Sequence, residues 1–151
     1  MDKTSTIQTE SISMEHLPSE YLMCILKDCP LSGRCLRYYA ATQQNSNLHV
    51  LTVVNPCYHD VATETCPWFR PNEKVTMKRG MTNFFHDMPG HMERSIRNQL
   101  IQIFGRTTYF NMRRGDRLIT PSEQQQIAKT CRENGWKGEL CYDGNVEDVE
   151  W

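Results

Sequence analysis

Apolar positions are most regular in the second half of the chain, where they recur at helical spacing. Between Met88 and Phe104 they fall three or four residues apart, and Gly105 follows where a helix commonly ends. This pattern predicts a helix over residues 88–104, with Asp87 as its N-cap. Residues 107–113 alternate and are rich in β-prone types. They predict a β-hairpin that returns over residues 117–119.

A capping box gives the clearest local signal. Thr120 stands three residues before Glu123, and Pro121 occupies the first helical position. These residues predict a helix that runs to about Glu133 and stops at the Asn-Gly pair of residues 134–135.

The first half of the chain predicts shorter elements. Residues 1–15 are polar and aperiodic, so we expect a disordered leader. Residues 20–27 and 35–42 each predict a short helix, separated by Asp-Cys-Pro, because proline cannot continue a helix. A strand is predicted at residues 48–54.

In the rest of this half, the sequence pattern predicts loops and one more strand. Loops are expected at residues 43–47 and 55–74, and a second strand at residues 74–78. The fold class is therefore α+β, a small single domain with a few short helices, one or two β-hairpins and a C-terminal capped helix.

Composition narrows the class of protein. The chain has 151 residues and a formal net charge of −1, so it has no global field that attracts nucleic acid or membrane. Its apolar runs are too short to cross a membrane, and its N-terminal residues do not form a secretory signal. We expect a cytoplasmic protein, and we exclude a membrane protein and a secreted disulfide scaffold.

Cysteines supply the candidate chemistry. Cys24, Cys29, Cys35 and Cys66 lie in one part of a chain that is short of aliphatic core residues. Since structural disulfides are rare in a reducing compartment, bunched thiols favour a metal site. Thiolates are preferred ligands of structural zinc and of iron–sulfur clusters. The spacing matches no standard zinc or ferredoxin motif, however, and free cysteines also simply fill cores.

The other cysteines have weaker interpretations. Cys57 and His59 form an alternative ligand pair, Cys131 is expected in the core, and Cys141 has no assigned role. A nucleophilic cysteine needs a base beside it. None of the five histidines is paired with a thiol by the sequence, so no catalytic residue is assigned and a non-enzymatic role is favoured.

Charge is segregated along the chain. Residues 70–117 hold ten basic and four acidic residues, and eight of the ten are arginines. One interpretation is a surface that binds nucleic acid or another anion through Arg106, Arg113, Arg114 and Arg117. The other is that these arginines pair with the acidic tail, residues 143–151, which then docks on the basic surface of the same chain while Trp151 anchors it in an apolar pocket. We favour the second interpretation.

Several of these motifs together resemble a family of small, uncharacterised bacterial proteins of gut anaerobes, a domain of unknown function. The resemblance rests on Cys29-Pro30, Cys35-Leu36-Arg37-Tyr38, Cys66-Pro67-x-Phe69-Arg70, Phe104-Gly105-Arg106, Tyr109-Phe110, Arg113–Arg117, Thr120-Pro121-x-Glu123-Gln124 and the acidic end at Trp151. Members of that family tend to carry cysteines at the positions of Cys24, Cys29, Cys35 and Cys66. The resemblance thus implies a four-sulfur site and no reaction.

These observations lead to one functional hypothesis and two alternatives. We expect a non-enzymatic binding or regulatory module for an unknown protein or nucleic-acid partner, with a four-cysteine site for zinc or an iron–sulfur cluster. The alternatives are a redox protein that uses a cluster or a dithiol/disulfide pair, and a nucleic-acid-binding module that uses the arginine-rich hairpin. The expected domain covers residues 16–142, with a cysteine-rich half at 16–70 and an arginine-rich helix–hairpin–helix half at 71–142.

Overall fold

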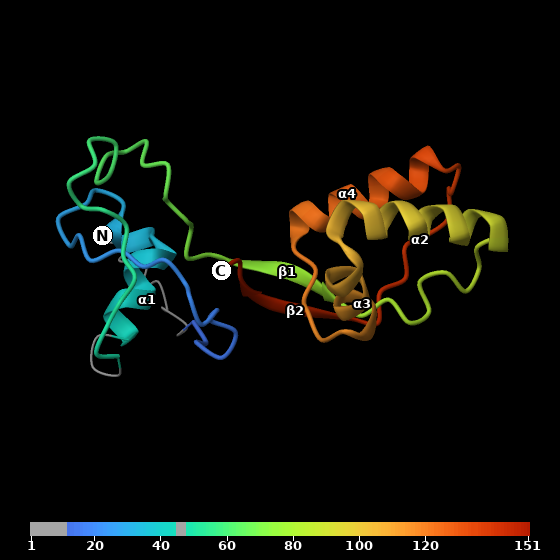
Figure 1. The fold of residues 1–151 in the computed structure, drawn as a ribbon, viewed down its shortest axis with the longest axis horizontal. Helices are drawn as coiled ribbons and strands as arrows, with labels where there is room; N and C mark the ends of the chain where they lie inside the picture. Colours follow the sequence, from blue (N-terminus) through green and yellow to red (C-terminus); the bar gives the residue numbers. More distant parts are fainter. Residues whose placement is uncertain (1–11, 45–47) are drawn as a thin grey trace, which may run out of the picture. The chain divides into compact units, whose positions relative to one another are not determined.

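The chain folds into two compact units. A computed structural model describes residues 12–44 and 48–151, so most of the expected disordered leader, residues 1–11, lies outside the described residues. The first unit contains the described residues up to Glu73 together with Val149–Trp151, and the second contains Lys74–Asp148. Helices and a two-stranded sheet together confirm the α+β class (Figure 1). No helix in the described part of the chain is long and apolar enough to span a membrane.

The second unit holds most of the regular structure. Figure 1 shows its helices beside its sheet. Its elements are β1 (Lys74–Arg79), α2 (Gly90–Phe104), α3 (Arg106–Arg114), α4 (Pro121–Glu133) and β2 (Gly144–Val149, whose last residue falls in the first unit). The strand predicted at 74–78 and the helices predicted at 88–104 and near 121–133 are confirmed.

Strand β2 is an element that the sequence analysis missed, because its residues were assigned to an acidic tail. It pairs antiparallel with β1: the Thr76 hydroxyl donates to the Glu147 carboxylate, and Lys78 Nζ donates to Asn145 Oδ1 at 2.8 Å. Exposure alternates along this segment, with Asn145 and Glu147 exposed and the residues next to them less so, which is the period of a strand rather than of a disordered tail.

Helix α3 replaces the hairpin predicted at residues 107–119, so that prediction is wrong. Tyr109 and Met112, three residues apart, are 1% and 0% exposed and share the face that packs into the core. Burial of this helical face outweighs the β propensity of the local residues. Gly105 and Gly115, both at positive φ, bound the helix. Of the expected return strand only a bridge between Ile119 and Lys78 forms.

The ends of α2 and α4 follow the predicted signals. Thr120 accepts from the Glu123 amide and Glu123 reaches back to the Thr120 amide, so the capping box is present. Helix α2 begins one residue after Pro89, and Asp87 is not its N-cap. The core of this unit has eleven buried members, drawn from the turn before α2 and from α2, α3, α4 and residue 119.

The first unit has far less regular structure. It contains a single turn of 3₁₀ helix (Ser32–Arg34) and α1 (Leu36–Gln44), which confirms the helix predicted at 35–42. Residues 43–44 of the predicted loop extend α1, and residues 45–47 lie outside the described residues. Residues 55–73 contain no helix or extended strand, as predicted.

The helix predicted at 20–27 and the strand predicted at 48–54 are both wrong. The two segments are extended and meet at one parallel bridge between Met23 and Val53. The Met23 amide donates to the Thr52 carbonyl and the Met23 carbonyl accepts from the Val54 amide, both at 2.9 Å. A tertiary contact therefore takes the backbone groups that a helix would have used.

A small apolar cluster forms the core of the first unit. Its buried members are Tyr21, Met23, Ala40 and Ala41. Trp151 packs against them, with its ring edge-on to Tyr21 at 5.4 Å between centroids. The C-terminal residues of the chain are thus part of this unit.

Candidate functional site

The four cysteines singled out from the sequence line one small cavity in the first unit. Cys24, Cys29, Cys35 and Cys66 come from four different segments and share this cavity of about 20 Å³. That volume accommodates a single body of about the size of one water molecule. Three of the four side chains are partly exposed and Cys35 is buried.

Backbone hydrogen bonds bring the first two cysteine segments to α1. The Cys24 amide donates to the Arg37 carbonyl at 3.1 Å. The Cys29 carbonyl accepts from the Ser32 amide at 3.0 Å, which begins the 3₁₀ turn that leads to Cys35. Cys24 and Cys29 are thereby held beside the start of α1.

The other two cysteine segments are joined to each other. Cys35 makes an isolated bridge with Pro71, and the Leu36 amide donates to the Arg70 carbonyl at 2.7 Å. Cys66 sits in a tight turn, in which its carbonyl accepts from the Phe69 amide at 3.2 Å. This turn enters the segment that pairs with Cys35, so local geometry places both thiols at one cavity.

Arg37 connects these segments through its side chain. Its Nη1 donates to the Leu22 carbonyl at 2.6 Å and its Nε donates to the Trp68 carbonyl at 2.8 Å. The guanidinium also lies over the rings of Tyr21, at 5.1 Å, and Trp68, at 6.0 Å. Arg37 therefore ties α1 to the segments that carry Cys24 and Cys66, and it brings a positive charge to the cavity wall.

The remaining wall is apolar, and this affects the thiols. Leu31, Val54 and Val61 are buried and line the cavity. Burial is the main cause that raises the pKa of Cys24 above its ordinary value, and the neighbouring thiols add to the effect. This direction is opposite to that of an attacking cysteine, whose pKa is lowered. A bound metal ion, in contrast, displaces the proton directly.

The donor set fits a metal that prefers sulfur, although it is not arranged around an ion. Four thiols and no carboxylate or imidazole line the cavity. This set matches the four-cysteine class of structural zinc sites. Among residues 12–44 and 48–151, no group of three or more His, Cys, Asp or Glu side chains is positioned to hold a metal ion. Binding would therefore require the sulfurs to close to about 2.3 Å from the ion.

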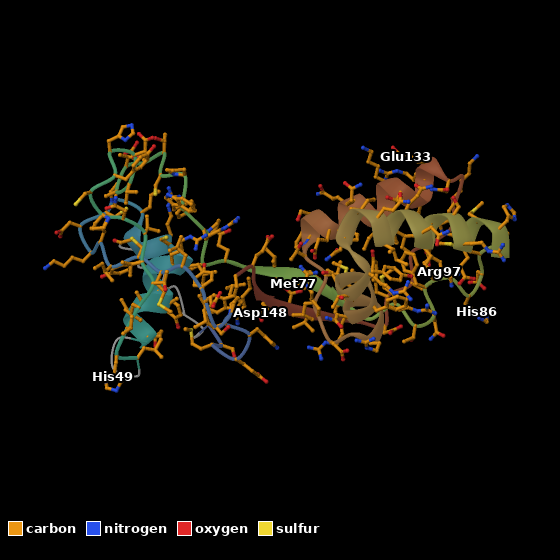
Figure 2. The ribbon with its side chains drawn as sticks, viewed as in Figure 1. His49, Met77, His86, Arg97, Glu133 and Asp148 are labelled. Carbon is orange, nitrogen blue, oxygen red and sulfur yellow. The ribbon has the colours of Figure 1, made fainter. Side chains whose placement is uncertain are left out.

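The other cysteines and the histidines lie away from this cavity. Cys57 and Cys141 are exposed, and Cys131 is buried in the core of the second unit as expected. Burial raises the pKa of the Cys131 thiol to about 11. All five histidines are exposed and none lines the cavity; Figure 2 shows His49 and His86 on loops.

Two of the four singled-out arginines have acidic neighbours close in sequence. Arg114 Nε donates to Asp116 at 2.8 Å, and Arg117 Nη2 donates to Glu123 at 2.7 Å. All four of these residues lie between the end of α3 and the first turn of α4. These contacts offset part of the positive charge that a nucleic acid would meet.

The other two arginines lie at opposite ends of α3. Arg106 begins the helix and stacks over the ring of Phe110 at 5.5 Å. Arg113 lies in its last turn and is half-buried near the Tyr109 hydroxyl. The structure thus spreads the four side chains along a helix and the following turn instead of a hairpin. Their role in anion binding stays a prediction.

Sequence reasoning missed two residues of this site, Arg37 and Trp68. Each stands two residues after one of the cysteines, Arg37 after Cys35 and Trp68 after Cys66. That proximity is the signal that could have marked them. Their hydrogen bond to each other depends on the tertiary fold, which the sequence pattern does not reveal.

Comparisons with known proteins give a family but no activity. No curated protein and no solved structure matches the chain. Residues 6–151, nearly the whole chain, match the model of a family of unknown function, DUF6078. The resemblance to an uncharacterised family is thereby confirmed, while an origin in gut bacteria stays a prediction. The chain belongs to DUF6078.

Proposed function

We propose that this protein is a non-enzymatic binding module whose first unit is held together by one zinc ion on Cys24, Cys29, Cys35 and Cys66. The observation that carries the proposal is that four thiols from four separate segments line one cavity of about 20 Å³. When bound, such an ion supplies structural stability rather than catalysis, because four protein ligands leave no open position.

The thin core of the first unit supports this proposal. Among its described residues, the apolar cluster around Tyr21 has four buried members, two of which are alanines, whereas the buried Leu31, Val54 and Val61 line the cysteine cavity itself. Small units that bury little apolar surface usually need a disulfide, a metal or a partner to be stable. All seven cysteines of the chain are free thiols in the structure, so a metal is the staple that these residues favour.

The cavity favours a single ion over a cluster. Its volume of about 20 Å³ matches one water-sized body, whereas an iron–sulfur cluster contains several iron and sulfide atoms. Four thiolates around one divalent ion carry a net charge of −2. The Arg37 guanidinium on the cavity wall offsets half of this charge.

Metal analysis of the full chain tests the proposal. Protein purified anaerobically, without a metal-affinity tag, should contain one zinc per chain. Cys66→Ser should lose it, whereas Cys57→Ser, which changes an exposed thiol of the same unit, should keep it. A metal-free wild type, or equal zinc in both variants, would overturn the proposal.

A redox role for the same thiols is the second candidate. It is favoured by the convergence of four free thiols on one cavity, where a dithiol could close to a disulfide. Mass analysis after mild oxidation would show a loss of two hydrogen atoms from peptides that contain two of these cysteines, since the added oxidant takes two electrons and two protons are released. Iron with labile sulfide and a reducible visible band would instead indicate a cluster.

A further inference from the structure

An open groove on the first unit presents two aromatic side chains. Tyr58 and Trp68 line it and are 48% and 45% exposed. The groove has a volume of about 510 Å³, within the range of roughly 300–1,000 Å³ typical of small-molecule sites. Its apolar lining includes Leu22, Val53 and Pro67.

Local hydrogen bonds fix the backbone that carries both aromatic residues. On the Tyr58 side, the Cys57 amide donates to Asn55 Oδ1 and the Val61 amide to the Tyr58 carbonyl, both at 3.0 Å. On the other side, the Trp68 carbonyl accepts from Arg37 Nε at 2.8 Å. The site is therefore largely formed before a ligand arrives, which lowers the entropic cost of binding.

The chemistry of the lining selects a cation. Of the described residues that line the groove, Asp60 alone is charged. The faces of Tyr and Trp attract cations through their ring quadrupoles. The Trp68 ring already makes one cation–π contact, because the Arg37 guanidinium lies 6.0 Å from its centroid. Arg37 lines the cysteine cavity and not the groove. An anionic ligand would be repelled by the Asp60 carboxylate.

We propose that this groove binds a small organic cation that carries a methylated ammonium group. Two aromatic side chains and one carboxylate provide the recognition chemistry for such a group, since methyl groups pack on the rings while the charge faces Asp60. His59 lies 3.4 Å from the same carboxylate and, when protonated, competes with the ligand. The proposal does not depend on a metal in the cysteine cavity.

An NMR titration of the full chain tests the proposal with choline as the probe. The Trp68 indole resonance, assigned with Trp68→Phe, should shift and saturate. The neutral isostere 3,3-dimethylbutan-1-ol should bind roughly tenfold more weakly, because it has the same shape without the charge. This comparison uses the wild-type protein and therefore needs no variant to fold.

Two matched variants then locate the charge that matters. Asp60→Asn should weaken choline binding about three- to tenfold, whereas Glu64→Gln, an exposed carboxylate of the same loop that does not line the groove, should leave it unchanged. Equal affinity for choline and its isostere, equal affinity in both variants, or the absence of a saturable shift would each overturn the proposal. Zinc analysis of the same samples reports on the metal site separately.

Discussion

The two units of this chain are stabilised in different ways. The second unit has three α-helices and a core of eleven buried residues. In its described part, the first has one α-helix and an apolar cluster of four, while other buried apolar residues line the thiol cavity, and its segments are tied by hydrogen bonds and by Arg37. The comparison teaches that apolar periodicity builds one unit, whereas the other depends on polar contacts at specific positions around four thiols.

Polar contacts in the second unit lock helices that burial already holds. Asn134, just after α4, accepts hydrogen bonds from Ser95 at 2.7 Å and Gln99 at 3.2 Å, both on α2. This network sits at the edge of the core, where it satisfies the end of α4. In the first unit, by contrast, the contacts of Arg37 join segments that have little regular secondary structure.

The largest expected effect is the loss of structure in the first unit alone when two of the four cysteines are replaced. Cys29→Ser combined with Cys66→Ser should abolish amide protection across the described residues up to 73, because the proposed ion would lose two ligands. Protection of residues 90–133 should stay as in the wild type. Hydrogen exchange with mass spectrometry measures both regions in one sample. The control pair, Cys57→Ser with Cys141→Ser, changes two exposed thiols and should have little effect; wild-type protection of the first unit in the Cys29/Cys66 variant would contradict the expectation.

Truncation of a buried side chain in α2 should instead destabilise the second unit. Leu100 is 1% exposed in α2, so Leu100→Ala should lower the free energy of unfolding of the second unit by about 3 kcal/mol. Ile103→Ala, at a 46% exposed position of the same helix, should cost less than about 1 kcal/mol. Urea denaturation monitored by circular dichroism gives both values. Similar losses would show that this core does not dominate the stability of α2.

A glycine substitution probes the turn that directly follows β1. Gly80 has φ +71°, and a Cβ there would collide with the Asp143 carboxylate, which accepts from the Thr82 amide at 3.1 Å. Gly80→Ala should therefore cost about 2 kcal/mol. Gly90→Ala, where the added Cβ meets open space, should change stability by less than about 1 kcal/mol. Thermal denaturation should rank the two variants in this order.

Alkaline pH should weaken the second unit through Cys131. Because burial raises the pKa of this thiol to about 11, the folded state keeps its proton after the unfolded state has lost it near pH 9. The free energy of unfolding of the second unit is therefore unaffected by this thiol below pH 9 and falls between pH 9 and pH 11. We expect a loss of about 1 kcal/mol, since a cavity of about 280 Å³ beside Cys131 admits water. Cys131→Ala should have a shallower slope over this window in urea titrations; an unchanged slope would exclude Cys131 as the cause.

The smallest effect concerns the capping box of α4. Thr120→Ala removes the oxygen that accepts from the Glu123 amide at 3.4 Å and should cost about 1 kcal/mol. Gln125→Ala, at an exposed position of the same helix, should change stability by less than about 0.5 kcal/mol. Chemical denaturation resolves this difference, and equal stabilities would mean that the Thr120 hydroxyl adds nothing to α4.

Local signals explain what could be predicted from the sequence. The capping box at Thr120 and the stop at Gly105 act within one helical turn, so the residues themselves define both ends. The hairpin prediction for residues 107–113 failed because the burial of Tyr109 and Met112 overrides the β propensity of these residues. The helix prediction for residues 20–27 failed because Met23 pairs with a segment about thirty positions away.

Only part of the candidate site could be predicted from the sequence. Clustering of four thiols in sequence pointed to one site, and their side chains do line one cavity. The role of Arg37 depends on hydrogen bonds to carbonyl groups of Leu22 and Trp68, which are 15 and 31 positions away. Such contacts leave no periodic trace in a sequence.

The assignment of residues 149–151 to the first unit has a consequence for biosynthesis. Trp151, whose ring meets Tyr21, is translated after the entire second unit. Domains usually fold from the N-terminus as they leave the ribosome. Here the first unit completes its core only after residues 149–151 have been made, so its final packing waits for the synthesis of the second unit.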